Sequence, residues 1–380
     1  MPSPTISEVA KQAGVSRATV SRVVNNNPHV DAALRKRVLD TIEALGYQPN
    51  RSARRLRAQS SSVIGLVISD IQNPYFISVI RGVEDASYAA EMSIILCNSD
   101  EDNTKQRIHL RVLEGERVAG LIIVPARSDE GEDLARLQKA GIPVILLDRI
   151  VDNIQVDTVR VDNARGAYDA VAHLVSLGYR RIAMIGGPMT LTTGSERFRG
   201  YRDALHEAGI TVDESLVKAG DFRAESGYRL AQELLTGSPP DAIFVANNLM
   251  TLGVMQCLRE AGVRVPEGMP LVGFDDMPWS AELYSPLTAV SQPTYELGQE
   301  AVALLVRRIA NANAPFRSVV LQTKLIVRES CGAKLKRAAP QDEATASAGV
   351  GENRPNPSAI YRGGSVNKRT LLRQRRRGER

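Results

Sequence analysis

The chain is poor in the residue types that build disulfides, metal sites and many catalytic centres. Its 380 residues include three cysteines, four histidines and one tryptophan, and aromatic residues make up only 4%. Cys97, Cys257 and Cys331 are far apart and form no CxxC pair, so we expect buried thiols in a reducing compartment. The histidines show neither HExxH nor another paired spacing, and we therefore expect no metal site and no cofactor.

Features of membrane, secreted and enzymatic proteins are also missing. No apolar run is long enough to span a membrane, and residues 1–5 do not begin a signal peptide, so we expect a cytoplasmic protein without a membrane partner. There is no GxSxG motif, no P-loop and no GxGxxG after a predicted strand. Asp275 and Asp276 are adjacent on one loop, where two carboxylates rarely share a substrate. We therefore do not expect an enzyme.

Charge is unevenly distributed along the chain. Residues 1–60 contain ten Lys or Arg and four Asp or Glu, a net charge of +6. Residues 334–380 contain twelve Lys or Arg and four Asp or Glu, a net charge of +8. Since the whole chain has a net charge of +5, residues 61–333 have a net charge of −9. A basic N-terminal segment on an acidic body is typical of a segment that contacts nucleic-acid phosphates.

The first 46 residues predict three short helices, the first two joined at a glycine. Thr5 and Glu8 have the spacing of a capping box. Gly14 suits a turn with positive φ, and Ser16 can cap the next helix. A third helix follows and ends at Gly46. Two helices joined in this way present the second one to the major groove of DNA.

The second helix places its valines inward and its polar residues outward. Val20, Val23 and Val24 face the other helices, and the outer side carries Arg17, Ala18, Ser21, Arg22 and Asn25. One alternative is a helical bundle whose arginines only solvate its surface. Because the caps, the glycine and the apolar faces all agree, we favour a DNA-binding head.

Residues 47–62 have the character of a basic linker with one short helix. Pro49 ends the preceding structure and Asn50 can cap a turn, but the segment is too short and too charged to be stable alone. We expect it to become helical only when its arginines are neutralised. Leu56 is apolar among arginines, which fits a wedge entering the minor groove, packing against a second copy, or both.

From Val63 onward, apolar runs alternate with amphipathic stretches. This pattern predicts α/β architecture with open parallel sheets covered by helices on both faces. Since about 270 residues exceed one such sheet, we expect two similar lobes. The predicted strands are 63–68, 93–96, 121–124, 144–147, 182–185, 242–245 and 271–274, and the predicted helices are 76–91, 103–114, 133–140, 164–177, 195–208, 224–235 and 249–261.

Ligands of such sheets bind at the carboxyl ends of the strands, so the residues just after each strand are candidate ligand groups. Carboxylates, arginines and amides bond hydroxyl groups, and aromatic side chains cover the apolar face of a ring, a mixture that suits a sugar or another small polyhydroxylated or anionic ligand. Alternatively, Asp148 and Arg149 form a plain salt bridge, and Tyr75 and Phe76 belong to the core. The candidate positions are Asp70 to Phe76, Asp148, Arg149, Thr193 to Arg197, Phe222, Asn247, Asn248, Asp275 and Asp276.

Four motifs together resemble the LacI/GalR family of bacterial transcription repressors over residues 4–332. They are Thr-Ile-x-x-Val-Ala-x-x-Ala-Gly-Val-Ser-x-x-Thr-Val-Ser-Arg-Val from Thr5, Gly-Tyr-x-Pro-Asn at 46–50, Asn-Pro-Tyr-Phe at 73–76 and Val-Gly-Phe-Asp-Asp at 272–276. The resemblance implies a helix-turn-helix head and a two-lobed body like the periplasmic sugar-binding proteins, with two doubly wound parallel sheets. It also implies a homodimer that binds a near-palindromic DNA operator. A small-molecule effector, a sugar or a sugar acid, would release the repressor from DNA. A ligand that instead promotes DNA binding is also possible in the family.

The resemblance also implies roles for residues at matching positions. Arg17, Ala18 and Arg22 would face base edges, and Asn50, Ala53 and Leu56 would belong to a hinge helix with Leu56 as the minor-groove lever. Phosphate contact or support of the recognition helix would fall to Thr5, Ser16, Thr19, Ser21, Asn25 and His29. The effector positions would be Asn73, Tyr75, Phe76, Asp148, Arg149, Arg197, Phe222, Asn248 and Asp275.

The implied domains are a head at 1–48, a hinge at 49–61 and a body at 62–332. The N-lobe would comprise 62–161 and 293–320, and the C-lobe 162–290 and 323–332, with crossings near Val161, Ser291 and Gln322. Residues 333–380 match nothing in the family and are rich in Ala, Gly, Ser, Pro and Arg, so we expect a disordered basic tail, either inert or adding nonspecific DNA affinity. The tail has no leucine heptads that would indicate a tetramer.

Several alternatives stay open at this point. A solute-binding protein without a regulatory role is the main one, but it predicts a signal peptide and no helix-turn-helix. Trp279 either lines the pocket or belongs to the core or a dimer interface. The effector is either a neutral sugar or an anionic one, since arginines tolerate sugar acids and phosphates.

Overall fold

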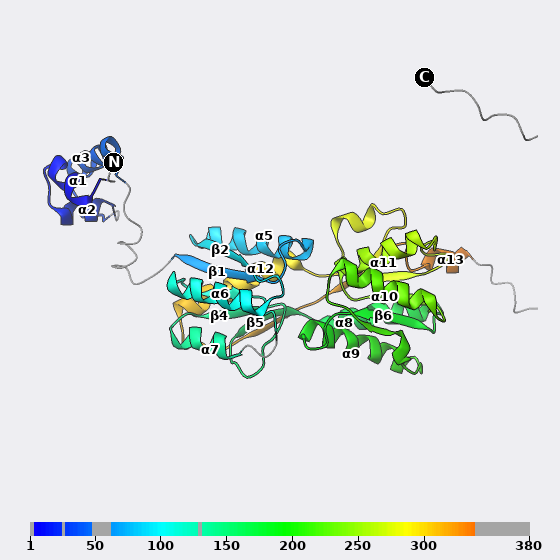
Figure 1. Ribbon diagram of the computed structural model, residues 1–380. Helices are drawn as coiled ribbons and strands as arrows, with labels where there is room; N and C mark the ends of the chain where they lie inside the picture. Colours follow the sequence, from blue (N-terminus) through cyan, green and yellow to red (C-terminus); the bar gives the residue numbers. More distant parts are fainter. Residues whose placement is uncertain (1–3, 25–26, 48–61, 128–130, 339–380) are drawn as a thin grey trace, which may run out of the picture. The chain divides into compact units, whose positions relative to one another are not determined.

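The computed structural model describes residues 4–24, 27–47, 62–127 and 131–338, and Figure 1 shows its elements. It confirms the predicted α/β class, with a helical N-terminal head and two sheets. Within this part of the chain, no helix is both long enough and apolar enough to cross a membrane.

Three helices form the head around a small apolar core. They are α1 (Ile6–Ala13), α2 (Arg17–Val24) and α3 (Ala32–Leu45), and the fully buried side chains between them are Val9, Val20 and Val38. At the start of α1, the Thr5 backbone N donates to Glu8 Oε2 at 2.6 Å and the Glu8 backbone N donates to Thr5 Oγ1 at 3.4 Å, which completes the capping box. Gly14, at a φ of 63°, ends α1 before the turn into α2.

The first lobe is built on a six-stranded parallel sheet. From one edge to the other, its strands are β11 (Ser318–Leu321), β5 (Asp157–Val161), β4 (Val144–Leu147), β3 (Leu121–Ile123), β1 (Val63–Ile68) and β2 (Ser93–Asn98). Its helices are α5 (Pro74–Ala89), α6 (Asn103–Gly115), α7 (Gly131–Lys139) and α12 (Thr294–Ala310).

The second lobe repeats this arrangement. Its sheet runs β12 (Lys324–Ile326), β10 (Thr288–Ser291), β9 (Leu271–Phe274), β8 (Ala242–Val245), β6 (Ile182–Gly186) and β7 (Val217–Ala219). Its helices are α8 (Asn163–Ser176), α9 (Thr192–Glu207), α10 (Ala224–Thr236) and α11 (Asn248–Glu260), with short 3-10 helices η1 (Glu214–Leu216) and η2 (Pro278–Ala281).

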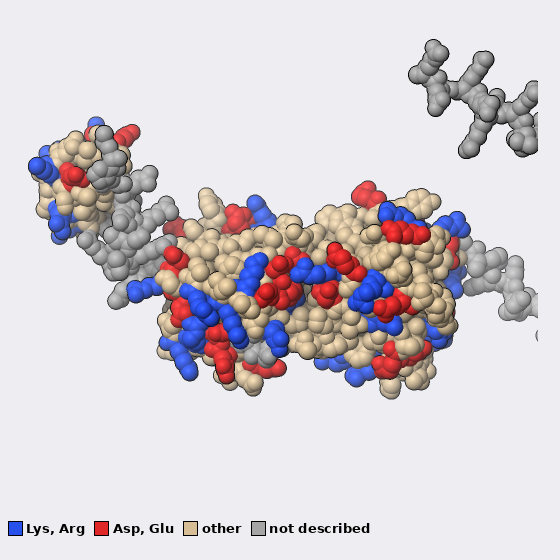
Figure 2. Space-filling view, in the orientation of Figure 1, with Lys and Arg blue, Asp and Glu red and all other residues tan. Residues whose placement is uncertain are grey.

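Each sheet is covered by helices on both faces, which explains why its central strands are apolar throughout. In β1, Ile64, Leu66 and Ile68 pack in one core with α5 and α12, while Val63 and Val67 pack in another with α6 and α7. Alternate residues of a strand point to opposite faces, so a strand between two helical layers buries every side chain. In contrast, the outer surface is well solvated, with acidic and basic side chains interspersed over the face that Figure 2 shows.

Three helix pairs are joined by the same kind of side-chain bond. In each pair, a tyrosine hydroxyl on one helix donates to a carboxylate on the other, which fixes how far the two helices can slide. The bonds are Tyr295 to Asp85 between α12 and α5 (3.0 Å), Tyr168 to Glu207 between α8 and α9 (2.6 Å), and Tyr228 to Glu260 between α10 and α11 (2.8 Å).

The chain passes between the two sheets at three places, and the last passage corrects the expectation of an all-parallel second sheet. Strand β11 of the first sheet is followed after two residues by β12, which pairs antiparallel to β10. The strands of both sheets otherwise run in parallel, so β11 ends at the edge where the lobes meet. Strand β12 therefore starts at that edge and runs away from it, opposite to its neighbours.

The first residues of the tail are helical, contrary to expectation. Residues 333–338 were expected to be disordered with the rest of residues 333–380, but they form helix α13 (Ala333–Ala338). Ala333 is buried in the second lobe beside Cys331, and Lys336 lies 5.0 Å from the centre of the Tyr179 ring. These contacts give the segment an apolar partner that its composition alone does not reveal.

Candidate functional site

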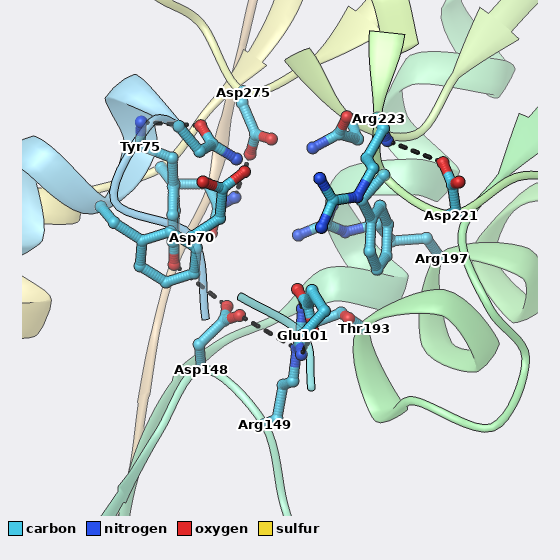
Figure 3. Close-up of a pocket in the computed structure, with 15 residues that line it drawn as sticks. Asp70, Tyr75, Glu101, Asp148, Arg149, Thr193, Arg197, Asp221, Arg223 and Asp275 are labelled. Carbon is cyan, nitrogen blue, oxygen red and sulfur yellow. Dashed lines mark hydrogen bonds and ion pairs between the residues drawn. The ribbon is translucent and has the colours of Figure 1, made fainter. Parts of the chain in front are cut away.

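A pocket opens where the carboxyl ends of the two sheets face each other, and Figure 3 shows its side chains. Parallel strands all end at the same edge of a sheet, so the loops that follow them bring their polar residues together. The first lobe contributes Asp70, Asn73, Tyr75, Phe76, Glu101, Asp148 and Arg149, and the second contributes Thr193, Arg197, Asp221, Phe222, Arg223, Asn247, Asp275 and Gln292.

Hydrogen bonds across the pocket join the two lobes. Asn248 Nδ2 donates to Asn73 Oδ1 at 2.8 Å, and both side chains are buried. At the mouth, Arg223 Nη2 lies 3.4 Å from Asp100 Oδ1 in the opposite lobe, where both side chains are about half exposed. A change in the angle between the lobes would break these polar contacts.

Arg149 and Glu101 form the shortest ion pair among the residues that line the pocket. Arg149 Nη1 and Nη2 donate to the two carboxylate oxygens of Glu101 at 2.6 and 2.7 Å. Burial alone would lower the pKa of Arg149, but the charge and hydrogen bonds of Glu101 raise it, so the guanidinium stays charged. Asp148 Oδ2 lies farther away, at 3.9 Å from Arg149 Nε.

Asp148 and Tyr75 form a second buried pair. The Tyr75 hydroxyl donates to Asp148 Oδ1 at 3.0 Å. Burial raises the pKa of Asp148, although the charges of Arg149 and Arg197 and the bond from Tyr75 oppose the shift. Burial also raises the pKa of the Tyr75 hydroxyl, with a further contribution from the neighbouring carboxylates, so this hydroxyl remains a donor.

Arg197 and Asp275 line the second-lobe side. Arg197 Nε donates to Asn163 Oδ1 at 2.9 Å, Nη1 donates to the Ala246 carbonyl at 2.7 Å, and the guanidinium carbon lies 3.8 Å from the centre of the Phe274 ring. Asp275 accepts from the Asn248 backbone N at 3.3 Å and from Gln292 Nε2. Burial raises the pKa of the Asp275 carboxyl, against the opposing charge of Arg197.

Backbone conformations around the pocket are unusual. Four lining residues other than glycine have positive φ: Glu101 at 58°, Asp148 at 67°, Phe222 at 66° and Asp275 at 74°. Such residues cost free energy and are held in place by their surroundings, and they gather at ligand-binding sites. The residues with strained backbone therefore lie in the same loops as the polar side chains that line the pocket.

Three polar atoms of the pocket are buried and without a hydrogen-bond partner. They are Thr193 Oγ1, Arg149 Nε and Gln292 Oε1. An unsatisfied buried polar group costs about 1–3 kcal/mol, so a site that keeps several together is suited to a polar ligand. Together they offer a hydroxyl, a donor and an acceptor.

The structure brings together nearly all the side chains that the sequence assigned to a ligand. Eight of the nine effector positions line the pocket, and Asn248 bonds two of them from just outside the lining. Tyr75 and Phe76 also belong to the first-lobe core, as the alternative predicted. Arg149 pairs chiefly with Glu101 and lies 3.9 Å from Asp148, so the predicted salt bridge with Asp148 is the weaker of its two ion pairs. Of the other lining residues, Asp70, Thr193 and Asn247 are among the candidates predicted at strand ends, whereas Glu101, Asp221, Arg223 and Gln292 were not predicted.

Trp279 does not line the pocket. It lies in η2 and packs, half-buried, against the apolar core of the first lobe together with the buried Met277. The pocket residue Asp275 precedes this segment, so one loop of the second lobe reaches both the pocket and the other lobe.

The head presents a second candidate surface. Arg17, Ala18 and Arg22 are exposed on α2, while Val20 and Val23 are buried beneath them. Ser16 accepts from the Thr19 backbone N at 3.1 Å and so caps the helix. Thr5, Ser16 and His29 are exposed, Thr19 and Ser21 are half-buried, and Asn25, Asn50, Ala53 and Leu56 lie outside the described residues.

Comparison with known proteins assigns both parts. Residues 5–50 match "Bacterial regulatory proteins, lacI family", and residues 171–331 match "Periplasmic binding protein-like domain". The chain is 36% identical over 328 residues to catabolite control protein A of Priestia megaterium, a match that covers 86% of this chain and 98% of that protein.

Two solved structures are similar over most of the chain. The complex of the transcriptional regulator CelR with cellobiose matches with a TM-score of 0.66 and 36% identity, covering 86% of this chain and 99% of that chain. The lac repressor dimer bound to operator and the anti-inducer ONPF matches with a TM-score of 0.77 and 29% identity, covering 87% and 99%. Since relatives above 30% identity align over nearly their whole length, and the motifs of the head and body agree with them, the chain belongs to the LacI family of bacterial transcriptional regulators.

Proposed function

We propose that the protein is a sequence-specific repressor that binds a near-palindromic operator as a homodimer and is released by a small sugar or sugar acid. The main support for the proposal is the pocket, which is lined by polar groups from both lobes, some of them without a hydrogen-bond partner. A ligand that binds these groups contacts both lobes and can therefore change the angle between them. Because such a ligand would favour one arrangement of the lobes, its binding would be linked to DNA affinity.

The head supplies the DNA contacts in this proposal. Helix α2 enters the major groove, and exposed Arg17 and Arg22 reach base edges, where an arginine that grips guanine contributes about 1–3 kcal/mol of discrimination. Ala18 leaves room for close approach. Asn50, Ala53 and Leu56 form the hinge, with Leu56 opening the central minor groove.

A homodimer is supported by the surface of the first lobe. Strand β2 is an edge strand, and exposed apolar side chains lie on it and on the two helices that pack beside it. Exposed edges invite pairing unless they are covered, and a second copy would cover this one. The side chains are Ile77 and Tyr88 of α5, Leu96 of β2, and Ile108 and Val112 of α6. The lac repressor relative is a dimer on its operator.

The effector class is supported by the lining and by a relative. Carboxylate, amide and hydroxyl groups beside Tyr75, Phe76 and Phe222 suit the hydroxyls and the apolar face of a sugar ring. The CelR relative was solved with cellobiose. A solute-binding protein without a regulatory role would have no use for the helix-turn-helix head.

The test is binding of the purified protein to DNA from upstream of its own gene, titrated at fixed salt with sugars and sugar acids. We expect a specific complex that one compound dissociates. Arg22→Ala should weaken specific binding at least about tenfold, whereas Arg229→Ala, an exposed arginine of α10, should not change it. Leu56→Ala should reduce specific binding and spare nonspecific binding.

Purely nonspecific, salt-sensitive DNA binding would contradict the proposal that the protein recognises an operator. A specific complex that no compound dissociates would contradict the proposal that a sugar or sugar acid is the effector. A compound that strengthens the complex would make the ligand a co-repressor.

A further inference from the structure

The charged side chains of the pocket carry an excess of negative charge. Five carboxyl groups face three guanidinium groups, and all eight appear as sticks in Figure 3. The carboxyl groups belong to Asp70, Glu101, Asp148, Asp221 and Asp275, and the guanidinium groups to Arg149, Arg197 and Arg223. A ligand with a negative charge of its own therefore enters a site that already has more acidic than basic groups.

Two of the three guanidiniums are balanced by carboxylates of the protein itself. Arg149 is 5% exposed and gives both terminal nitrogens to Glu101. Arg223 lies at the mouth beside Asp100, an acidic residue in addition to the five that line the pocket. An arginine binds a carboxylate or phosphate through two parallel N–H groups. The two terminal nitrogens of Arg149 already donate to Glu101, so they are not available to an anionic ligand.

The third guanidinium, Arg197, is held by neutral partners, and its charge acts on the carboxyl groups of Asp148 and Asp275. Its bonds to Asn163 and to the Ala246 carbonyl fix it against the Phe274 ring. Burial raises the pKa of Asp148 and of Asp275 despite the charge of Arg197 nearby. The pocket thus disfavours negative charge on its own groups, and the same cost applies to an anionic ligand.

Helix N-termini often bind anions, and two of those at this pocket are capped by side chains, whereas α9 and α10, beside the lining residues Thr193 and Arg223, have no side-chain cap. The Tyr75 backbone N in the first turn of α5 donates to Asn73 Oδ1 at 3.0 Å, and the Met250 backbone N of α11 donates to Asn247 Oδ1 at 2.9 Å. These caps occupy backbone donors that a phosphate or carboxylate would otherwise use.

The geometry points to an uncharged polyhydroxylated effector, and to the exclusion of the corresponding sugar acids and sugar phosphates. The inference rests on the proposed role of the pocket as an effector site. It narrows that role, because hydroxyl groups donate to carboxylates such as Asp148 and Asp275 without adding charge, and accept from Thr193 and Arg149.

Calorimetric titration of the full-length protein at constant ionic strength tests this. The probes are matched sets: glucose, glucuronate and glucose 6-phosphate; galactose, galacturonate and galactose 6-phosphate; ribose and ribose 5-phosphate; cellobiose and cellobionate. We expect one neutral compound to bind, and each of its anionic counterparts to bind at least about tenfold more weakly. An anionic compound that binds as tightly as its neutral counterpart overturns the inference but leaves the effector site standing. If no compound binds to a protein that still binds its operator, the proposed sugar effector fails and this inference fails with it.

A charge-neutral variant tests the cause. The Asp221 side chain accepts only from the Arg223 backbone N at 2.9 Å among the bonds of the described residues, and an asparagine can keep that bond. Asp221→Asn should therefore reduce the preference for the neutral compound over its acid about threefold or more, whereas Glu233→Gln, on the exposed side of α10, should leave it unchanged. Asp70→Asn provides a second variant in case the first is unstable. An unchanged preference in both pocket variants would contradict the charge explanation.

Discussion

Arg328 donates to both carboxylate oxygens of Asp276, from Nη1 at 2.7 Å and from Nη2 at 2.9 Å. Arg328 follows β12, and its Nη1 also donates to the Leu287 carbonyl at 2.7 Å. The pair fixes the loop after β9, in which the preceding Asp275 holds a left-handed φ of 74° and faces the pocket. Asp276 is therefore a positioning residue for Asp275.

Arg328→Gln should weaken effector binding about five- to tenfold, because the loop that presents Asp275 loses its clamp. The pair is 20% and 14% exposed, so we also expect a loss of about 1–2 kcal/mol in the free energy of unfolding. Calorimetry and thermal unfolding measure the two effects. Arg229→Gln, in an exposed pair with Glu233, should change stability by less than about 0.5 kcal/mol. Unchanged effector affinity in Arg328→Gln would leave the clamp with a purely structural role.

Trp279→Ala should weaken the effect of the ligand on DNA binding without abolishing ligand binding. Trp279 and Met277 carry the loop from Asp275 onto the apolar core of the first lobe, so they couple the pocket to that lobe. Coupling between sites is typically about 1–3 kcal/mol, and we expect the effector-induced fall in operator affinity to shrink several-fold. Operator titration with and without effector measures it. Tyr284→Ala, at a fully exposed side chain of the same segment, is the control. A full effector response in Trp279→Ala would place the coupling elsewhere.

Gly187→Ala should reduce effector affinity at least about tenfold while operator binding persists. A Cβ at this position would lie 2.0 Å from Cζ of Phe222, so the ring must move from its place in the pocket lining. Calorimetry measures the affinity. Gly115→Ala has no atom within 4 Å of its new Cβ and serves as the control. Wild-type affinity in Gly187→Ala would mean that Phe222 does not contact the ligand.

Two buried aspartates should respond in opposite ways to neutralisation. Burial raises the pKa of Asp148 above its unfolded value of 3.8, so the folded protein binds this proton more tightly. Stability contributed by the group is therefore lost as pH rises from about 4 through the raised pKa. Asp148→Asn should consequently unfold at the same or a higher temperature at pH 7 than the wild type, but bind effector poorly. A clear loss of stability at pH 7 would contradict the assigned direction.

Asp157 supplies the contrast. It is fully buried, and it accepts from Arg308 Nε at 2.8 Å and from the Arg317 backbone N at 2.8 Å. Asp157→Asn removes one partner of a buried ion pair and should cost about 3 kcal/mol or more of unfolding free energy at pH 7. Thermal unfolding of both variants from pH 5 to pH 8 separates an aspartate kept for ligand binding from one kept for stability.

The pocket residues that sequence reasoning missed follow from the strands that it missed. Strands β1 and β4 were predicted to the residue, because a strand buried on both faces is an unbroken apolar run. Strand β7 was not predicted, since its three residues are only partly buried at a sheet edge, and Asp221 and Arg223 follow it. Likewise Gln292 follows β10, which was not predicted, and Glu101 follows β2, which was ended two residues early. The predicted central strands therefore led to their ligand groups, whereas the edge strands β2 and β7 and the unpredicted inner strand β10 did not.

The first helix of the head depends on a single capping residue. Thr5 Oγ1 accepts from the Glu8 backbone N and donates to Glu8 Oε2 at 3.0 Å, while the Thr5 backbone N donates to the same Glu8 oxygen at 2.6 Å. The bond from the backbone N and, to a smaller extent, the bond from the hydroxyl lower the pKa of Glu8. Thr5→Ala should destabilise α1 by about 1 kcal/mol. Because α1 packs against the recognition helix through Val9 and Ala10, operator affinity should fall several-fold while effector affinity stays unchanged. Ser7→Ala, at an exposed position of the same helix, should lower neither. Thr5→Ala keeps the backbone bond to Glu8 Oε2, so it removes only the contribution of the hydroxyl to the lowered pKa of Glu8. That contribution stabilises α1 above the unfolded pKa of 4.5 and is lost as pH falls through the lower folded value. The difference between Thr5→Ala and wild type in amide-exchange protection of α1 should therefore shrink toward acid pH. A difference that is constant from pH 7 down to pH 3 would show that the Thr5 hydroxyl acts without the Glu8 carboxylate.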